Sequence, residues 1–209
     1  SFVPGANVRA DGSTHAPQLD EAAVLARLIG PDGATVSGIL AARLTSLQVT
    51  KMFWTKGDVR GVADALRKAG DPSVVVDVVR SALEAPQVAS AGEVVSGGEM
   101  LTLELASALL PLTVPLLQSP HGQYADVALR FSRKVAGSFM LLLQQAPEAL
   151  AALERGGIGV DLVGEERAAR AGAARSALLS LREPLAALAT GGGELAPRAR
   201  ELAGILDQL

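Results

Sequence analysis

The chain has 209 residues, a formal net charge of −3 and no cysteine, and it is 49% hydrophobic but only 3% aromatic. The lack of cysteine excludes a disulfide framework, thiolate metal sites and cysteine nucleophiles, and the small negative charge predicts no global attraction to nucleic acid or to anionic lipid. Alanine, leucine and valine must then supply the core, and such residues favour closely packed helices.

Residues 1–17 contain glycine and proline and little to bury, so we expect a flexible arm or linker before a helical domain over residues 18–209. The arm lacks the apolar segment of a signal peptide, and the start at Ser1 leads us to expect part of a longer protein. The most membrane-like stretch, residues 101–117, contains Glu104, Pro111 and Pro115, which favours a buried helix over a membrane-spanning one.

Two helices are predicted in the first part of this domain. One spans Asp20 to Ile29 and is stopped by the glycines and proline of residues 30–33. The next is capped by Thr35 and ends before Gly57, and its apolar residues recur at intervals of three, four or seven, the repeat of one helical face. The residues of this face are Val36, Ile39, Leu40, Leu44, Leu47 and Trp54.

A third helix is expected over Asp58 to Ala69, with Asp58 as its N-cap. Asp71-Pro72 then starts a fourth, because the carboxylate can cap the helix and proline is harmless in a first turn. The valines between residues 74 and 79 would equally suit a buried strand by propensity alone. The Asp-Pro start and the continuation through Ala82-Leu83 favour a helix, packed antiparallel to its neighbour across a short connection.

Residues 85–98 are interpreted as a polar, Gly-rich insertion, and further helices are predicted after it. In all, the sequence predicts an all-α protein with about eight or nine helices in an antiparallel, α-solenoid-like array, without a fixed-period repeat. The later helices are expected from Glu99 with a bend near Pro111 or Pro115, from Ser119-Pro120, over Pro147–Arg155, over about Gly164–Leu188, and after Pro197, ending at Leu209.

The residue pattern offers no catalytic, metal or cofactor site. His15 and His121 are the two histidines, and neither has a metal-ligand partner four residues on. The glycines of residues 156–159 follow no strand and lack the spacing of a nucleotide-binding turn. Glu165 and Glu166 point about 100° apart on a helix, so they favour a helix amino terminus rather than converging on one substrate atom. We therefore expect a protein-binding role, with an enzyme of unfamiliar site as an alternative that a deep polar pocket of convergent titratable groups would revive.

A local excess of basic charge lies between Arg43 and Arg80, where seven basic residues stand against four aspartates. This segment either presents a positive face to an acidic protein surface or is a solvated helix surface with pairs such as Arg60–Asp64 and Asp64–Lys68. Trp54 likewise suits either a core anchor or an interface hot spot.

Several motifs occur in a fixed order along the chain. They are Arg43-Leu44-Thr45-Ser46-Leu47-Gln48-Val49, Trp54-Thr55-Lys56-Gly57-Asp58-Val59, Asp71-Pro72-Ser73-Val74-Val75-Val76-Asp77, Leu109-Leu110-Pro111, Leu116-Leu117-Gln118-Ser119, Tyr124, Gly159-Val160-Asp161-Leu162 and Glu165-Glu166-Arg167. Together they make residues from about Glu21 to Leu209 resemble the carboxy-terminal domain of the large, WD-repeat regulatory subunit of katanin. Residues 88–98 and the Ala/Gly-rich tail depart from that pattern.

The resemblance implies a non-catalytic regulatory domain that binds the amino-terminal domain of the katanin catalytic subunit, an AAA ATPase that severs microtubules. It also implies microtubule contact, recruitment of spindle-pole or minus-end proteins, and a cytoplasmic, cytoskeletal location at the centrosome, spindle pole or ciliary axoneme. The alternative is a helical scaffold of another complex, of the vesicle-coat or trafficking type. At the matched positions, the candidates for partner binding or apolar packing are Leu47, Trp54, Val59, Val75 and Val79, and the candidates for tubulin binding are Arg43, Lys51, Lys56, Arg60, Arg67 and Lys68.

Overall fold

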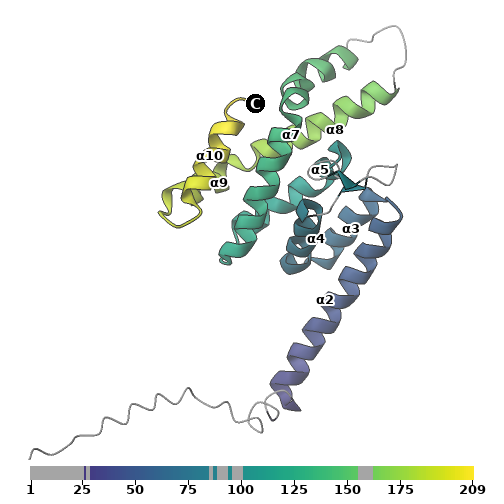
Figure 1. The fold of residues 1–209 in the computed structure, drawn as a ribbon, viewed down its shortest axis with the longest axis vertical. Coiled ribbons are helices and arrows are strands. Elements are labelled where there is room, and N and C mark those ends of the chain that lie inside the picture. Colours follow the sequence, from purple (N-terminus) through teal and green to yellow (C-terminus); the bar gives the residue numbers. More distant parts are fainter. Residues whose placement is uncertain (1–25, 27–28, 85–86, 89–93, 96–100, 155–161) are drawn as a thin grey trace, which may run out of the picture. The chain divides into compact units, whose positions relative to one another are not determined.

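The computed structural model describes residues 26, 29–84, 87–88, 94–95, 101–154 and 162–209 (Figure 1). These residues are mainly helical, so the all-α prediction is confirmed. The contacts divide the chain into two units, residues 1–42 and residues 43–209. The predicted arm over 1–17 lies outside the described residues, and of the predicted helix over 20–29 only Ala26 and Ile29 are described, both of them helical.

The first long helix, α2, spans Pro31–Thr55 and therefore begins four residues before the predicted cap, Thr35. The expectation that Gly30, Pro31 and Gly33 would stop the preceding helix fits the bend at Gly30 but was wrong for Pro31 and Gly33, which lie within α2. Proline lacks a backbone N–H, but the first turn of a helix needs no such donor, so Pro31 is compatible with a helix start. Thr35 lies within the helix instead of capping it.

The next two helices confirm their predicted starts. Helix α3 spans Val59–Ala69, and the Asp58 carboxylate accepts a hydrogen bond of 2.8 Å from the Gly61 amide as its N-cap. Helix α4 spans Pro72–Glu84, and the Asp71 carboxylate accepts a hydrogen bond of 2.8 Å from the amide of Ser73. The valines of α4 are buried on a helix, so the capping signal outweighed strand propensity.

The segment predicted as an insertion contains two short strands, β1 (Gln87–Val88) and β2 (Val94–Val95). They pair antiparallel, with Gln87 opposite Val95 and Val88 opposite Val94. The rest of residues 85–98 lies outside the described residues.

The predicted bend near the prolines at 111 and 115 is confirmed as a division into three short elements. They are α5 (Leu103–Leu109), the 3₁₀-helix η1 (Leu110–Thr113) and α6 (Val114–Leu117). The α5 helix is capped by Thr102, whose hydroxyl accepts a 3.1 Å hydrogen bond from the Leu105 amide.

Helix α7 spans Gly122–Glu154 without interruption, so the prediction that Pro147 would begin a separate helix was wrong. Pro147 is exposed and lies inside α7. A proline removes one hydrogen bond of a helix, but it does not oblige the chain to turn when its ring faces solvent.

The predicted helix over 164–188 is two helices, α8 (Leu162–Leu179) and α9 (Arg182–Thr190). Pro184 explains the division, because it has no N–H to donate to the carbonyl group of Ser180. Pro184 is instead buried in the first turn of α9, where a proline is tolerated. The terminal helix, α10, spans Ala196–Leu206, so Pro197, which was predicted to precede this helix, lies in its first turn.

Within residues 43–209, α7 is the central helix of the core. It packs on α4, α6, α8 and α10, while α5 contacts α3 and α8, and α9 contacts α6 and α10 (Figure 1). Phe131 of α7 is fully buried at the centre of this cluster. The buried side of α8 consists largely of alanine, which allows α7 and α8 to approach closely.

Candidate protein-binding surface

The apolar face of α2 changes its surroundings along the helix. Near its carboxyl end, Leu47 and Trp54 are half-buried and pack against the core. On the same face nearer its amino end, the side chains of Leu40 and Leu44 are 57% and 56% exposed, and Val36 and Ile39 are exposed too. At about 100° per residue these positions form one stripe. Among the residues that the structure describes, this apolar face is thus packed against the core near the carboxyl end of α2 and exposed nearer its amino end.

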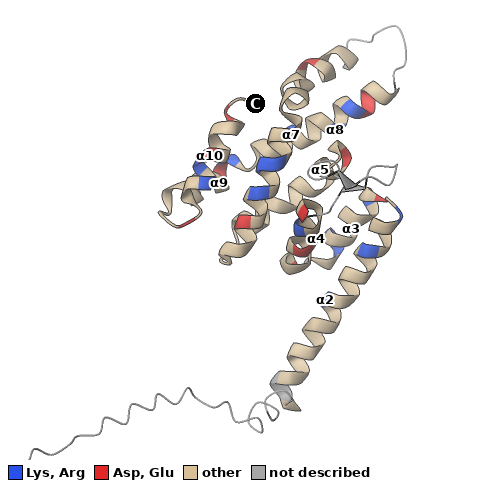
Figure 2. Cartoon of the chain, viewed as in Figure 1, with Lys and Arg blue, Asp and Glu red and all other residues tan. Residues whose placement is uncertain are grey.

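The uncovered part of this face is free of charge. Residues 33–42 contain no acidic or basic side chain, which Figure 2 shows as an uncoloured stretch of α2. A contiguous apolar surface of this kind marks protein-binding sites in soluble proteins. We call Val36, Ile39, Leu40 and Leu44 the α2 apolar stripe.

Arg43, the first charged residue after the uncharged run of residues 33–42, is tied to α4. Arg43 donates a hydrogen bond from its guanidinium group to the Asp77 carboxylate, and both side chains are about a third exposed. This hydrogen bond, reinforced by the negative charge of Asp77, raises the pKa of Arg43 above its ordinary value. The ion pair therefore fixes the side of α2 that faces α4.

Trp54 separates two shallow grooves within residues 43–209. One groove, of about 260 Å³, is lined by Leu47 and Trp54 of α2 together with Val78 of α4. The other, of about 300 Å³, is lined by Trp54, by Val59 of α3 and by residues at the start of α5. Three predicted partner-binding residues, Leu47, Trp54 and Val59, are therefore brought together around these grooves, and all three are half-buried.

The other two predicted partner-binding residues lie elsewhere. Val75 and Val79 are 7% and 0% exposed and belong to the core cluster. Their burial fits the packing role that the sequence analysis gave as the alternative, and partner binding by these two residues stays a prediction.

The predicted basic residues are only partly gathered. Lys51 and Lys56 are exposed on or just after the last turns of α2, and Arg60, Arg67 and Lys68 are exposed on α3 (Figure 2). Arg43 is not included with these five residues, because its guanidinium group is already paired with the Asp77 carboxylate of α4. We call the five exposed residues, Lys51, Lys56, Arg60, Arg67 and Lys68, the basic patch.

The ion pairs expected within the basic patch take a different form. Among the described residues, Asp64 pairs with Arg67 at 2.6 Å, three residues away, and not with Arg60 or Lys68. Arg60 and Arg67 also line a groove of about 310 Å³ together with Glu104 of α5. The solvated-surface alternative thus holds for Arg67, while Arg60 and Lys68 have no ion pair in the part of the chain that is described.

The described residues show no cluster suited to metal binding. No group of three His, Asp or Glu side chains there could hold a metal ion. His121 is exposed and lies edge-on to Tyr124 with ring centroids 5.1 Å apart, whereas His15 lies outside the described residues. Glu166 pairs with Arg170 at 2.9 Å on the surface of α8. No helix in the described ranges has the length and apolar content required to cross a bilayer.

Two features escaped the sequence analysis. The α2 apolar stripe was recognised as a helical face, but periodicity does not reveal whether such a face is covered, so its residues were not among the partner-binding candidates. A cavity lined by Arg80 and Arg130 was also missed, because its walls come from segments that are far apart in the sequence.

Comparison with known proteins identifies the family. Residues 31–206 match the con80 domain of katanin. Two Arabidopsis thaliana relatives are katanin p80 WD40 repeat-containing subunit B1 homologs: KTN80.2 is 32% identical over 80% of this chain, and KTN80.3 is 28% identical over 76% of it. The aligned regions cover 13% and 16% of those proteins, so the chain spans a small part of their length. The resemblance found in the sequence is therefore confirmed, and the chain belongs to the katanin con80 domain family of the non-catalytic p80 subunits.

Proposed function

We propose that this chain is a regulatory adaptor domain that binds the amino-terminal helical domain of the katanin catalytic ATPase subunit. The observation that carries this proposal is the α2 apolar stripe, which continues a face that the same helix buries against its own core. An amphipathic helix of a partner could lie along such a face, as in helix-in-groove recognition. The family membership supports a katanin partner over a vesicle-coat or trafficking scaffold.

The grooves on either side of Trp54 extend this surface within residues 43–209. Tryptophan is among the residues that most often dominate binding energy, and it does so when a partner side chain excludes water around it. Leu47, Trp54 and Val59 line the grooves and remain accessible. We therefore add these three residues, as a binding surface of residues 43–209 taken by itself, to the residues proposed for partner contact.

The experiment is an isothermal titration calorimetry measurement of the Kd between the chain and the purified amino-terminal domain of the catalytic subunit. The double substitution Leu40→Glu/Leu44→Glu places two charges on the α2 apolar stripe and should weaken binding about 1,000-fold, because two interface anchors are lost at about 2 kcal/mol each.

The matched control is Val49→Glu/Met52→Glu. Val49 and Met52 are also exposed apolar residues of α2, at 41% and 45%, but they lie more than about 120° around the helix from the line through Leu40 and Leu47. This control should bind within about threefold of the unmodified chain. Equal weakening by both variants, or no binding by the unmodified chain at micromolar concentration, would refute the proposal.

We further propose that the basic patch contributes to microtubule binding and so to the cytoskeletal location of the complex, at the centrosome, spindle pole or axoneme. Exposed lysine and arginine attract an acidic surface such as that of tubulin over a range set by ionic strength. Reversing Arg60, Arg67 and Lys68 to glutamate in the assembled pair should lower co-sedimentation with microtubules, most strongly at low salt. Unchanged co-sedimentation at low salt would exclude this role.

A further inference from the structure

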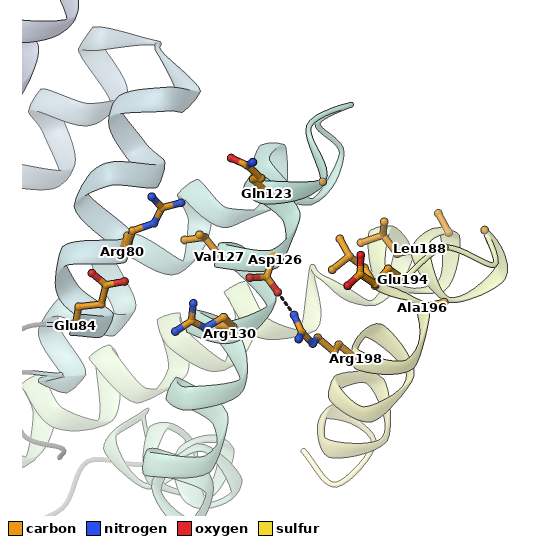
Figure 3. Close-up of a pocket in the computed structure, with 15 residues that line it drawn as sticks. Arg80, Glu84, Gln123, Asp126, Val127, Arg130, Leu188, Glu194, Ala196 and Arg198 are labelled. Carbon is orange, nitrogen blue, oxygen red and sulfur yellow. Dashed lines mark hydrogen bonds and ion pairs between the residues drawn. The ribbon is translucent and has the colours of Figure 1, made fainter. Parts of the chain in front are cut away.

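A cavity of about 940 Å³ lies on residues 43–209, away from α2 and α3. Its walls are α4, the first turns of α7, and the segment from the end of α9 to the start of α10 (Figure 3). Val127, Leu188 and Leu195 give it an apolar lining, while exposed residues such as Gly191 and Glu194 form its border with solvent. It is therefore an open groove with an apolar base, a shape that suits an extended peptide.

Two arginines that line this cavity have no partner among the described residues. Arg130 could pair with Asp126 one turn earlier on α7, but Asp126 pairs instead with Arg198 of α10 (Figure 3). Arg80 precedes Glu84 by four residues on α4, which is the less favourable order for a helical ion pair, and no pair forms. Both guanidinium groups thus keep their hydrogen-bond donors available.

The charged side chains that line the cavity balance, with Arg80, Arg130 and Arg198 against Glu84, Asp126 and Glu194, and the amino end of α7 adds partial positive charge. Gly122 and Gln123, in the first turn of the 33-residue helix α7, also line it, and the amino end of a helix carries partial positive charge. Glu84 and Glu194 lie on opposite walls, so a uniformly acidic ligand would be repelled there.

We propose that this cavity binds a linear segment of a partner protein that carries an aspartate or glutamate beside an apolar side chain. The carboxylate would accept hydrogen bonds from Arg80 and Arg130, and the apolar side chain would cover Val127 and Leu188. None of these residues belongs to the surface proposed above for the catalytic subunit, so this proposal holds or fails independently of that one.

The test uses a phage-displayed library of random dodecapeptides, selected on the 209-residue chain, with affinities of the selected peptides measured by fluorescence polarisation. The proposal predicts peptides that share an acidic residue beside an apolar one. Their affinity should fall at least about 10-fold for Arg80→Glu/Arg130→Glu, and also when the peptide's carboxylate is replaced by an amide.

The matched control, Lys134→Glu/Arg167→Glu, changes the net charge equally at residues that do not line the cavity, and its affinity should stay within about twofold. As an independent readout, the peptides should shift the backbone amide NMR signals of Gly122, Gly191 and Gly193 in the unmodified chain. Failure to select peptides, selected peptides without acidic residues, equal binding by Arg80→Glu/Arg130→Glu, equal loss in the control, or unshifted glycine signals would overturn the proposal.

Discussion

Replacing Trp54 with alanine separates a core role from an interface role for the chain's single tryptophan. A fully buried aromatic residue costs about 3–5 kcal/mol when it is truncated to alanine. Trp54 is only half-buried, so we expect a loss of about 1.5–2.5 kcal/mol in the free energy of unfolding. In a chain of this size, that loss corresponds to a decrease in Tm of about 3–10 °C.

The matched comparison is Phe131→Ala. Phe131 is 0% exposed at the centre of the core, so its truncation should cost about 3–5 kcal/mol and lower Tm by about 6–20 °C. Both values are measured by circular dichroism during thermal and urea unfolding. Because Trp54 is the single tryptophan, its fluorescence emission should also move to shorter wavelength when the catalytic subunit's amino-terminal domain covers it.

The two results must differ in a definite way. Trp54→Ala should reduce partner affinity at least about 10-fold while destabilising the chain less than Phe131→Ala does. If Trp54→Ala lowers stability as much as Phe131→Ala and leaves partner affinity unchanged, then Trp54 is a core anchor. The grooves beside it would then have no part in binding.

Two further substitutions test the local packing. Gly61→Ala should destabilise the chain by about 1–3 kcal/mol in urea unfolding, because a Cβ there would collide with the Phe53 ring and lie 2.6 Å from an oxygen of the capping carboxylate. Gly137→Ala, within α7 and with nothing within 4 Å of the added Cβ, should instead stabilise by up to about 1 kcal/mol, and a loss there would contradict the assigned packing. Asp77→Ala should cost less than about 1 kcal/mol, because its ion pair with Arg43 is partly exposed, and a double-mutant cycle with Arg43→Ala measures that coupling. A much larger coupling energy would show that the pair is more important than its exposure indicates.

Local signals predicted the first half of the fold well. Asp58 and Asp71 each precede a helix, and the carboxylate of each accepts a hydrogen bond from a free backbone amide in the first turn of that helix. This capping signal depends on neighbouring residues alone. The prolines were harder to interpret, because their effect depends on the environment. Pro147 faces solvent and leaves α7 continuous, whereas the buried Pro184 coincides with the boundary between α8 and α9. Sequence periodicity cannot distinguish these environments.

The candidate surfaces were harder to predict than the helix boundaries, because they depend more on tertiary contacts. The spacing of apolar residues in α2 predicts a face, but only the structure shows which part of that face is covered by the chain itself. The same applies to Val75 and Val79, whose motif matched the family while their side chains are buried. Arg80 and Arg130 come together through the packing of α4 on α7, which no local pattern encodes.

The uncovered stretch of α2 also has a consequence for how the chain behaves when it is produced alone. An exposed apolar surface favours self-association. If the catalytic subunit covers the α2 apolar stripe as proposed, solubility should improve when both subunits are synthesised together in equal amounts. By mass action, a partner present at about 100 times its Kd would add about 2.7 kcal/mol of apparent stability. Orphan copies of the domain would then be the ones that unfold and are degraded first, which would keep the two subunits in stoichiometric balance.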